Sequence, residues 1–282
     1  MEETTKKWLT GCGIGCILII AMACLVIFGG YLGVKKMIDA ARETSAAVET
    51  VTARFGRVSD FTPDPYGNVE PERLETFLLV RELCSTERAR LEDSLAQLSG
   101  TEPDGGPTSV GSMARSLRAG FGFMPQMMAY INARNSAFLE AEMGLGEYLH
   151  LYTIVYESWL GKAPDDGPPF VLVGGDMDSN GWSATEVRSQ RGAEIRARLN
   201  RTTLPMLRNQ LAALTTTDAA ADAQWTESLR TEILLMESDG LRLPWQDGLP
   251  PQTATDLEPF FEALDASYSA LCHPVEFAVI QH

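Results

Sequence analysis

The chain has few of the residues and motifs on which most enzymatic chemistry depends. It contains three histidines, and it has no Gly-x-Ser-x-Gly nucleophile elbow, no phosphate-binding glycine loop and no zinc-ligand spacing. It also lacks an internal repeat and an alternation of strand and helix patterns, which argues against a solenoid and against a parallel α/β sheet. No catalytic activity is evident from these features.

Positive charge is scarce beyond the N-terminal region. Residues 1–57 carry seven Lys/Arg against five Asp/Glu, whereas residues 58–282 carry sixteen against thirty-three. An acidic domain of this kind repels phosphate backbones, so we expect no nucleic-acid partner. Arginine supplies almost all of the positive charge after Lys36, and this bias, with abundant Ala and Gly, fits a GC-rich bacterial genome.

No charged residue occurs between Lys7 and Lys35. This stretch exceeds the ~20 apolar residues that a helix needs to cross a bilayer. Trp8 and Tyr31 lie near its ends, where aromatic rings favour the headgroup level. We therefore predict a short tail over 1–8 and a transmembrane helix over 9–34 that binds the lipid bilayer. The alternative, a buried core helix, is disfavoured because soluble helices are rarely apolar on every face.

The transmembrane helix is predicted to be an uncleaved signal anchor, because its apolar core runs beyond the length of a cleavable signal peptide. We place the chain in a bacterial inner (cytoplasmic) membrane as a single-pass protein. A short tail with two lysines is the usual start of a signal anchor, so the soluble domain is predicted to be extracytoplasmic. The basic residues that follow the span support the alternative, a cytoplasmic domain.

Two small-residue steps lie on one face of the predicted span, because they are separated by five helical turns. Such steps let two helices approach closely, so a homo-oligomer is one predicted partner. The four glycines of these steps are Gly11, Gly15, Gly29 and Gly33.

The rest of the chain is predicted to be all-α. Residues 35–57 continue as a helical stalk, and residues 58–282 form one acidic, multi-helix soluble domain with long Pro/Gly-rich loops. The spacing of apolar residues predicts helices over 71–98, 110–119, 125–143, 146–159, 183–214, 219–238 and 255–271. The last of these should end before His273-Pro274.

Two cysteines, Cys84 and Cys272, lie in the soluble domain. In an oxidising compartment this pair is a candidate disulfide that would close a long loop. Two buried free thiols are the alternative.

Asp176, Asp178 and Asn180, followed by Gly181, match the first positions of a calcium loop, in which alternating oxygens converge on the ion. Position twelve of the loop requires a bidentate Glu and is Val187 here. An Asx/Gly turn is the alternative. Calcium is thus the one cofactor that the sequence indicates, and otherwise none is expected.

The first functional hypothesis is a membrane-tethered helical binding or scaffold protein, or an accessory subunit of a bacterial envelope complex, with an envelope protein as partner. One alternative is a membrane-anchored hydrolase using carboxylates or a metal. It requires Glu140, Glu147 and His150 to converge with another acid in a buried cleft. The other alternative is a calcium-stabilised sensor or adhesion module built around Asp176.

Overall fold

The computed structural model describes residues 45–99, 110–168, 184–217 and 223–277. Every regular element in these ranges is helical, and the ranges contain no strand, which confirms the predicted all-α class for this part of the chain. Residues Ala46–His282 form one compact unit. None of the described helices is both long and apolar enough to cross a bilayer. The predicted tail and span, residues 1–34, lie outside the described residues.

The end of the predicted stalk, from residue 46 onward, is part of this unit. Residues 45–55 are helical and are followed by η1 (Val58–Asp60). Val51 is buried in the main hydrophobic cluster, and Phe55 and Val58 pack against it. Gly146 allows this approach, because a Cβ there would lie 2.8 Å from the Val58 carbonyl oxygen.

Helices α2 (Pro71–Leu83) and α3 (Ser85–Ser99) take the place of the single helix predicted over 71–98. Pro71 occupies the first turn of α2, where its missing N–H costs nothing. The chain leaves helical geometry at Cys84, where φ is −97° and ψ is 7°. The apolar stripe crosses this break, since Leu74, Phe77 and Val80 are buried before it and Leu91 and Leu95 after it.

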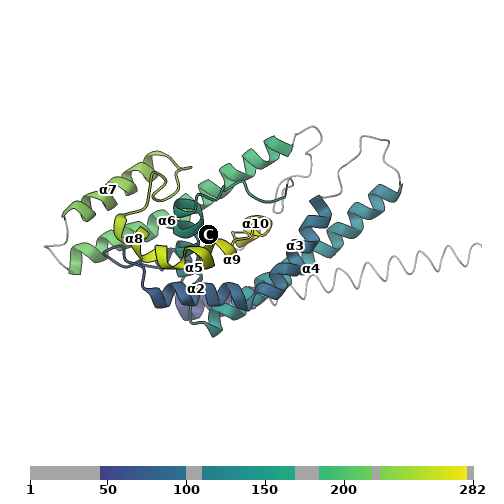
Figure 1. The fold of residues 1–282 in the computed structure, drawn as a ribbon, viewed down its shortest axis with the longest axis horizontal. Coiled ribbons are helices and arrows are strands. Elements are labelled where there is room, and N and C mark those ends of the chain that lie inside the picture. Colours follow the sequence, from purple (N-terminus) through teal and green to yellow (C-terminus); the bar gives the residue numbers. More distant parts are fainter. Residues whose placement is uncertain (1–44, 100–109, 169–183, 218–222, 278–282) are drawn as a thin grey trace, which may run out of the picture. The chain divides into compact units, whose positions relative to one another are not determined.

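Helix α4 (Val110–Glu140) packs beside α3 (Figure 1). The two helices predicted on either side of residue 120 are one continuous helix, and Pro125 lies inside it. The described part of its buried stripe recurs at helical spacing and includes Phe123, Met127, Tyr130, Ile131, Arg134, Asn135, Ala137 and Phe138.

The central helix consists of α5 (Leu145–Tyr152) and η2, a π-helical continuation over Thr153–Trp159. Five consecutive residues from Thr153 to Glu157 are buried, so this segment is enclosed on every face. π-Helical segments are rare and occur often at functional positions. Here the segment carries Tyr156 and Glu157, which belong to the polar core described below.

Helices α6 (Ala184–Thr217) and α7 (Ala223–Ser238) pack against each other through a separate cluster that includes Leu207, Leu214 and Leu229 (Figure 1).

The prediction of a single helix over 255–271 was wrong. This part of the chain forms three shorter elements, which are α8 (Pro251–Leu257), η3 (Glu258–Phe260) and α9 (Phe261–Ser267). Pro259 lies at the first junction and removes a backbone donor there. Helix α10 (His273–Glu276) begins at His273-Pro274, because proline is tolerated in a first helical turn.

A truncation should locate the N-terminal limit of the compact unit. Deleting residues 1–44 should leave its unfolding temperature unchanged. Deleting residues 1–57 should lower it by roughly 5–15 °C, because Val51 and Phe55 leave the core and a buried side chain of this size contributes about 1.5–3 kcal/mol. Thermal unfolding followed by circular dichroism measures this, with Val51→Ala in the shorter deletion as the matched control. Equal melting temperatures for both deletions would show that residues 45–57 do not stabilise the unit.

Candidate functional site

Most of the predicted site residues lie outside the part of the chain that the structure describes. The calcium loop and the small-residue steps of the span therefore stay predictions. Within the described residues, no group of three or more His, Cys, Asp and Glu side chains is arranged to hold a metal ion. The predicted residues outside the described ranges are Asp176, Asp178, Asn180, Gly11, Gly15, Gly29 and Gly33.

Cys84 and Cys272 are both free, and both are buried in the same hydrophobic cluster, which α3 and α4 form with the C-terminal segment. The Cys84 thiol donates to the Val80 carbonyl oxygen at 3.2 Å. Burial raises the pKa of both thiols, that of Cys272 to about 12, so both are protonated at neutral pH. A bridge between them in an oxidising compartment stays a prediction.

The three residues of the hydrolase hypothesis have separate surroundings. Both oxygens of Glu147 accept hydrogen bonds from Arg73, each at 2.5 Å. The ring of His150 packs against Phe61, with 5.7 Å between ring centroids, and burial lowers the pKa of His150 to about 4. Glu140 is exposed. Glu147 and His150 are thus part of the packing around η1 and α2.

A charged cluster lies at the centre of the unit instead, around Glu276 of α10. Arg81 of α2 donates to Glu276 Oε1 at 3.2 Å, and Arg134 of α4 donates to Oε2 at 2.8 Å. The hydroxyls of Tyr130 and Tyr148 donate to the same carboxylate at 2.5 and 3.2 Å. All five side chains are at most 2% exposed, so one carboxylate joins three helices of different sequence regions.

The pKa of Glu276 reflects this environment. Burial alone would raise the pKa, but the guanidiniums of Arg81 and Arg134, with the hydrogen bond from Tyr130, hold it at about 2. Two guanidiniums surround one carboxylate, so the cluster carries a net positive charge. Aromatic faces offset part of this charge, since Arg81 lies 5.2 Å from the Tyr156 ring centroid and Arg134 lies 5.7 Å from that of Phe138.

A second buried set consists of Tyr152, His273 and Glu157. The Tyr152 hydroxyl lies 3.0 Å from His273 Nδ1, and Glu157 Oε1 lies 3.2 Å from His273 Nε2. Burial lowers the pKa of His273 to about 4 and raises the pKa of Glu157 to about 8. The carboxyl and the imidazole together therefore hold one proton at neutral pH and form a neutral pair.

The order hydroxyl, imidazole and carboxyl is that of a catalytic triad, but the position differs. The side chains of His273 and Glu157 are both 0% exposed, and Tyr152 packs among the rings of the core. None of the open pockets described below includes these residues. The arrangement thus positions α10 against η2, within the part of the chain that the structure describes.

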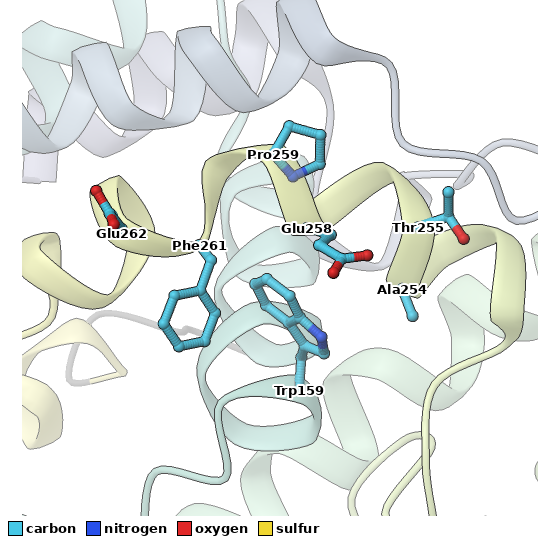
Figure 2. A pocket seen from close by; sticks show the side chains of 7 residues that line it. All are labelled: Trp159, Ala254, Thr255, Glu258, Pro259, Phe261 and Glu262. Atoms are coloured by element: carbon cyan, nitrogen blue, oxygen red, sulfur yellow. The ribbon is translucent and has the colours of Figure 1, made fainter.

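The open pockets lie on the surface, and one of about 690 Å³ is formed by Trp159 and the segment from α8 to α9 (Figure 2). The rings of Trp159 and Phe261 meet edge to face, with centroids 5.6 Å apart. Phe261 is 49% exposed. Glu258 and Glu262 are exposed at the same pocket, so it combines aromatic surface with negative charge.

Two adjoining pockets of about 550 and 440 Å³ meet at Trp245, and we call them together the Trp245 groove. The ring of Trp245 stacks on that of Trp225 of α7, with centroids 5.6 Å apart. A hydrogen bond fixes the position of the Trp225 ring, because its Nε1–H donates to the Pro65 carbonyl oxygen at 2.8 Å. Gly67, with φ of +78°, lets its turn pass under this ring, since a Cβ there would lie 2.8 Å from Trp225.

Trp245 has an unusual backbone conformation. Its φ is +55°, which a bulky residue rarely adopts and which costs on the order of 1–3 kcal/mol. The buried carboxylate of Glu232 accepts the Trp245 N–H at 2.9 Å. Arg242 fixes that carboxylate by two hydrogen bonds of 3.0 Å. A strained residue with this support is typical of functional positions.

Comparison with protein-family models, with curated proteins and with solved structures found no match. The function is therefore inferred from the geometry alone.

Sequence reasoning missed both the charged core and the Trp245 groove. One signal was present for the core, because Arg81 follows Leu74 by two helical turns and Arg134 follows Met127 by the same interval. Arginine within an apolar stripe indicates a buried ion pair. For the groove, the turn-rich stretch before α8 contained Trp245 between two turn residues, but nothing local places it beside Trp225.

Proposed function

We propose that the chain is a membrane-tethered helical protein that acts by binding, as a scaffold or accessory subunit of a bacterial envelope complex, with its acidic domain on the extracytoplasmic side. The observation that carries this proposal is an extended aromatic and acidic surface on both sides of α8. The predicted span over 9–34 supplies the tether.

The two sets of pockets share one face of α8. Pro251 lines the Trp245 groove, whereas Ala254, Thr255 and Glu258 line the pocket at Trp159. Residues three and four positions apart are neighbours on a helix surface, so these four form a single stripe. Three of them are exposed, and Ala254 is partly exposed. A partner that contacts α8 would therefore reach aromatic rings at both ends of this helix.

Charge favours a basic partner for this surface. Glu258 and Glu262 flank the first pocket, and Glu227 and Asp247 flank the groove. Oppositely charged patches steer association and suppress incorrect partners. Aromatic residues surrounded by charged rims are also enriched at protein interfaces.

The placement of the titratable groups supports binding over hydrolysis. A general acid or base must lie within hydrogen-bond reach of a substrate. Three acids and bases with shifted pKa values, Glu157, His273 and Glu276, are buried in the core. The described surface pockets, in contrast, offer rings and exposed carboxylates.

Photo-crosslinking in native membranes tests the binding function. A photoreactive residue at Thr255 of the full chain should give a discrete crosslinked species, whereas the same residue at Asp93, exposed on α3, should not. Mass spectrometry identifies the product. No product at Thr255, or an identical pattern at both positions, would contradict the proposal.

The tether is tested separately by fractionation. The full chain should partition with membranes and resist extraction by carbonate. A chain that begins at residue 45 should be released into the soluble fraction. Recovery of the full chain as a soluble protein would contradict the anchor without affecting the crosslinking result.

A further inference from the structure

We propose that the Trp245 groove binds a proline-rich, arginine-containing segment of a partner protein in the extended polyproline II conformation. This inference rests on the proposed binding function and names the partner's chemistry at one part of the same surface.

The shape and composition of the groove fit such a segment. The apolar part of its walls includes the Trp245 and Tyr66 rings and Pro250 and Pro251. Polyproline II has three residues per turn and presents flat pyrrolidine faces, which pack on aromatic rings. Tyr66 is 38% exposed although it is a large aromatic residue, so its ring is available to a ligand.

The groove also offers the hydrogen-bond donor that this ligand requires. A polyproline II segment has no internal hydrogen bonds, so its carbonyl groups need donors from the partner. Among the described residues, none accepts a hydrogen bond from the Trp245 indole N–H, whereas that of Trp225 is bound to Pro65. The Trp245 N–H is therefore the donor that remains for a ligand carbonyl.

The rim accounts for the arginine. Glu227 and Asp247 have side chains that are 74% and 77% exposed at the groove, and Glu227 lies 4.0 Å from the exposed Arg230. Arg242 is the one cation that lines the groove in the described residues, and it is already paired with Glu232 and Asp247. A ligand with its own guanidinium complements this charge and can form a paired hydrogen bond with a carboxylate.

A glycan fits the groove less well. Sugar recognition combines ring stacking with several side-chain groups that bond hydroxyls, and two amides here each use one N–H within the protein. Gln252 donates to the Tyr66 carbonyl at 3.1 Å, and Asn68 donates to Asp64 at 3.1 Å. Besides the hydroxyls of Ser228 and Thr231, the groove offers ring faces, one indole donor and carboxylates, and these suit a proline-rich peptide.

The supports of Trp245 prepare the groove for binding. The strained backbone is fixed by Glu232 and Arg242, and the ring is fixed by stacking on Trp225. A prepositioned ring loses little conformational freedom when a ligand binds, and polyproline II is itself a low-entropy conformation. Binding therefore costs little conformational entropy in either the groove or the peptide.

The test is a titration of the full chain in detergent micelles with an octaproline peptide that has an arginine at each end. Calorimetry should detect binding. Trp245→Ala should weaken it at least ~30-fold, as expected for a central aromatic anchor. Trp245→Phe keeps a ring but removes the donor, and it should weaken binding by about 2–10-fold.

Charge and location have their own controls. Replacing the terminal arginines by glutamates, or Glu227 by glutamine in the protein, should weaken binding by about 2–5-fold at low salt and reduce its salt dependence. Leu79→Ala changes an exposed apolar side chain on α2, which lines neither pocket, and should leave the affinity unchanged. Far-ultraviolet circular dichroism of each variant verifies that it is folded.

The possible outcomes separate the inference from the binding function. If the Thr255 crosslink forms but the peptide does not bind, or binds the Trp245 variants equally well, the inference is overturned and the binding function stands. Binding of a soluble glycan in place of the peptide would also overturn it. Loss of both the crosslink and peptide binding would contradict both proposals.

Discussion

Replacing Glu276 with glutamine should lower the free energy of unfolding by about 3–5 kcal/mol, because it leaves two buried guanidiniums without a carboxylate. Arg81 and Arg134 are at most 2% exposed, and together they surround this one anion. Glutamine keeps the shape of the side chain, so the loss measures charge and hydrogen bonding more than packing. For a unit of this size the melting temperature should fall by roughly 10–15 °C.

The matched control is Glu258→Gln, which removes an exposed carboxylate at the Trp159 pocket and should change the free energy of unfolding by less than ~0.5 kcal/mol. A double-mutant cycle with Arg134→Met should show strong coupling, because the second substitution removes a charge that the first has left unpaired. Equal melting temperatures for Glu276→Gln and Glu258→Gln would show that the cluster does not stabilise the fold.

The change in the free energy of unfolding at acidic pH gives the sign of the same interaction. The pKa of Glu276 is held at about 2 in the folded state, below its usual value of 4.5. A depressed acid pKa contributes stability above the unfolded value, and this stability is lost as the pH falls from 4.5 through 2. Glu276→Gln should remove this dependence, so the wild type and the variant should converge in stability toward pH 2.

Local pattern accounts for much of the fold. The stripe that begins with Leu74 and Phe77 predicted the core-facing side of α2, and Pro71 predicted its start. The pattern did not resolve where helices break. Pro125 lies within a continuous α4, whereas Pro259 lies in η3, where the α-helical geometry of α8 ends, because surrounding packing decides whether a helix accommodates a missing donor.

The candidate sites depended on contacts that no local pattern encodes. Glu276 and Arg81 are 195 positions apart and meet only because α10 packs into the core beside α2. Trp245 and Trp225 lie on opposite sides of a turn after α7, and their stacking depends on the strained conformation of Trp245. His273 was expected to follow a helix, but it begins one and reaches Glu157 from there.

Replacing Glu157 with glutamine should invert the pH dependence of stability between pH 5 and pH 8.5. In the folded wild type, Glu157 and His273 hold one proton from about pH 4 to about pH 8. In the unfolded chain the same two groups, with ordinary pKa values of 4.5 and 6.5, hold one proton only between those values. The two states therefore bind equal numbers of protons from pH 4.5 to 6.5, so this pair does not make stability depend on pH in that range.

Above pH 6.5 the unfolded imidazole loses its proton while the folded pair retains one until about pH 8. The folded state then binds more protons, so stability falls as the pH rises through this window. The raised pKa of Glu157 results first from burial, which Arg196 opposes and Asp165 and Asp166 reinforce. Over about 1.5 pH units the loss is on the order of 2 kcal/mol.

In Glu157→Gln only His273 titrates, and burial keeps its pKa below the unfolded value. The free energy of unfolding of the variant should therefore be constant above pH 6.5. It should decrease as the pH falls from 6.5 toward 4, because the unfolded imidazole gains a proton that the folded one does not. Urea unfolding at pH 5, 6.5 and 8.5 measures both limbs, with the exposed Glu262→Gln as the matched control. Parallel profiles for Glu157→Gln and the wild type would show that Glu157 does not hold the proton that the folded state keeps above pH 6.5, since removal of that carboxyl must then move the slope from the alkaline to the acid side.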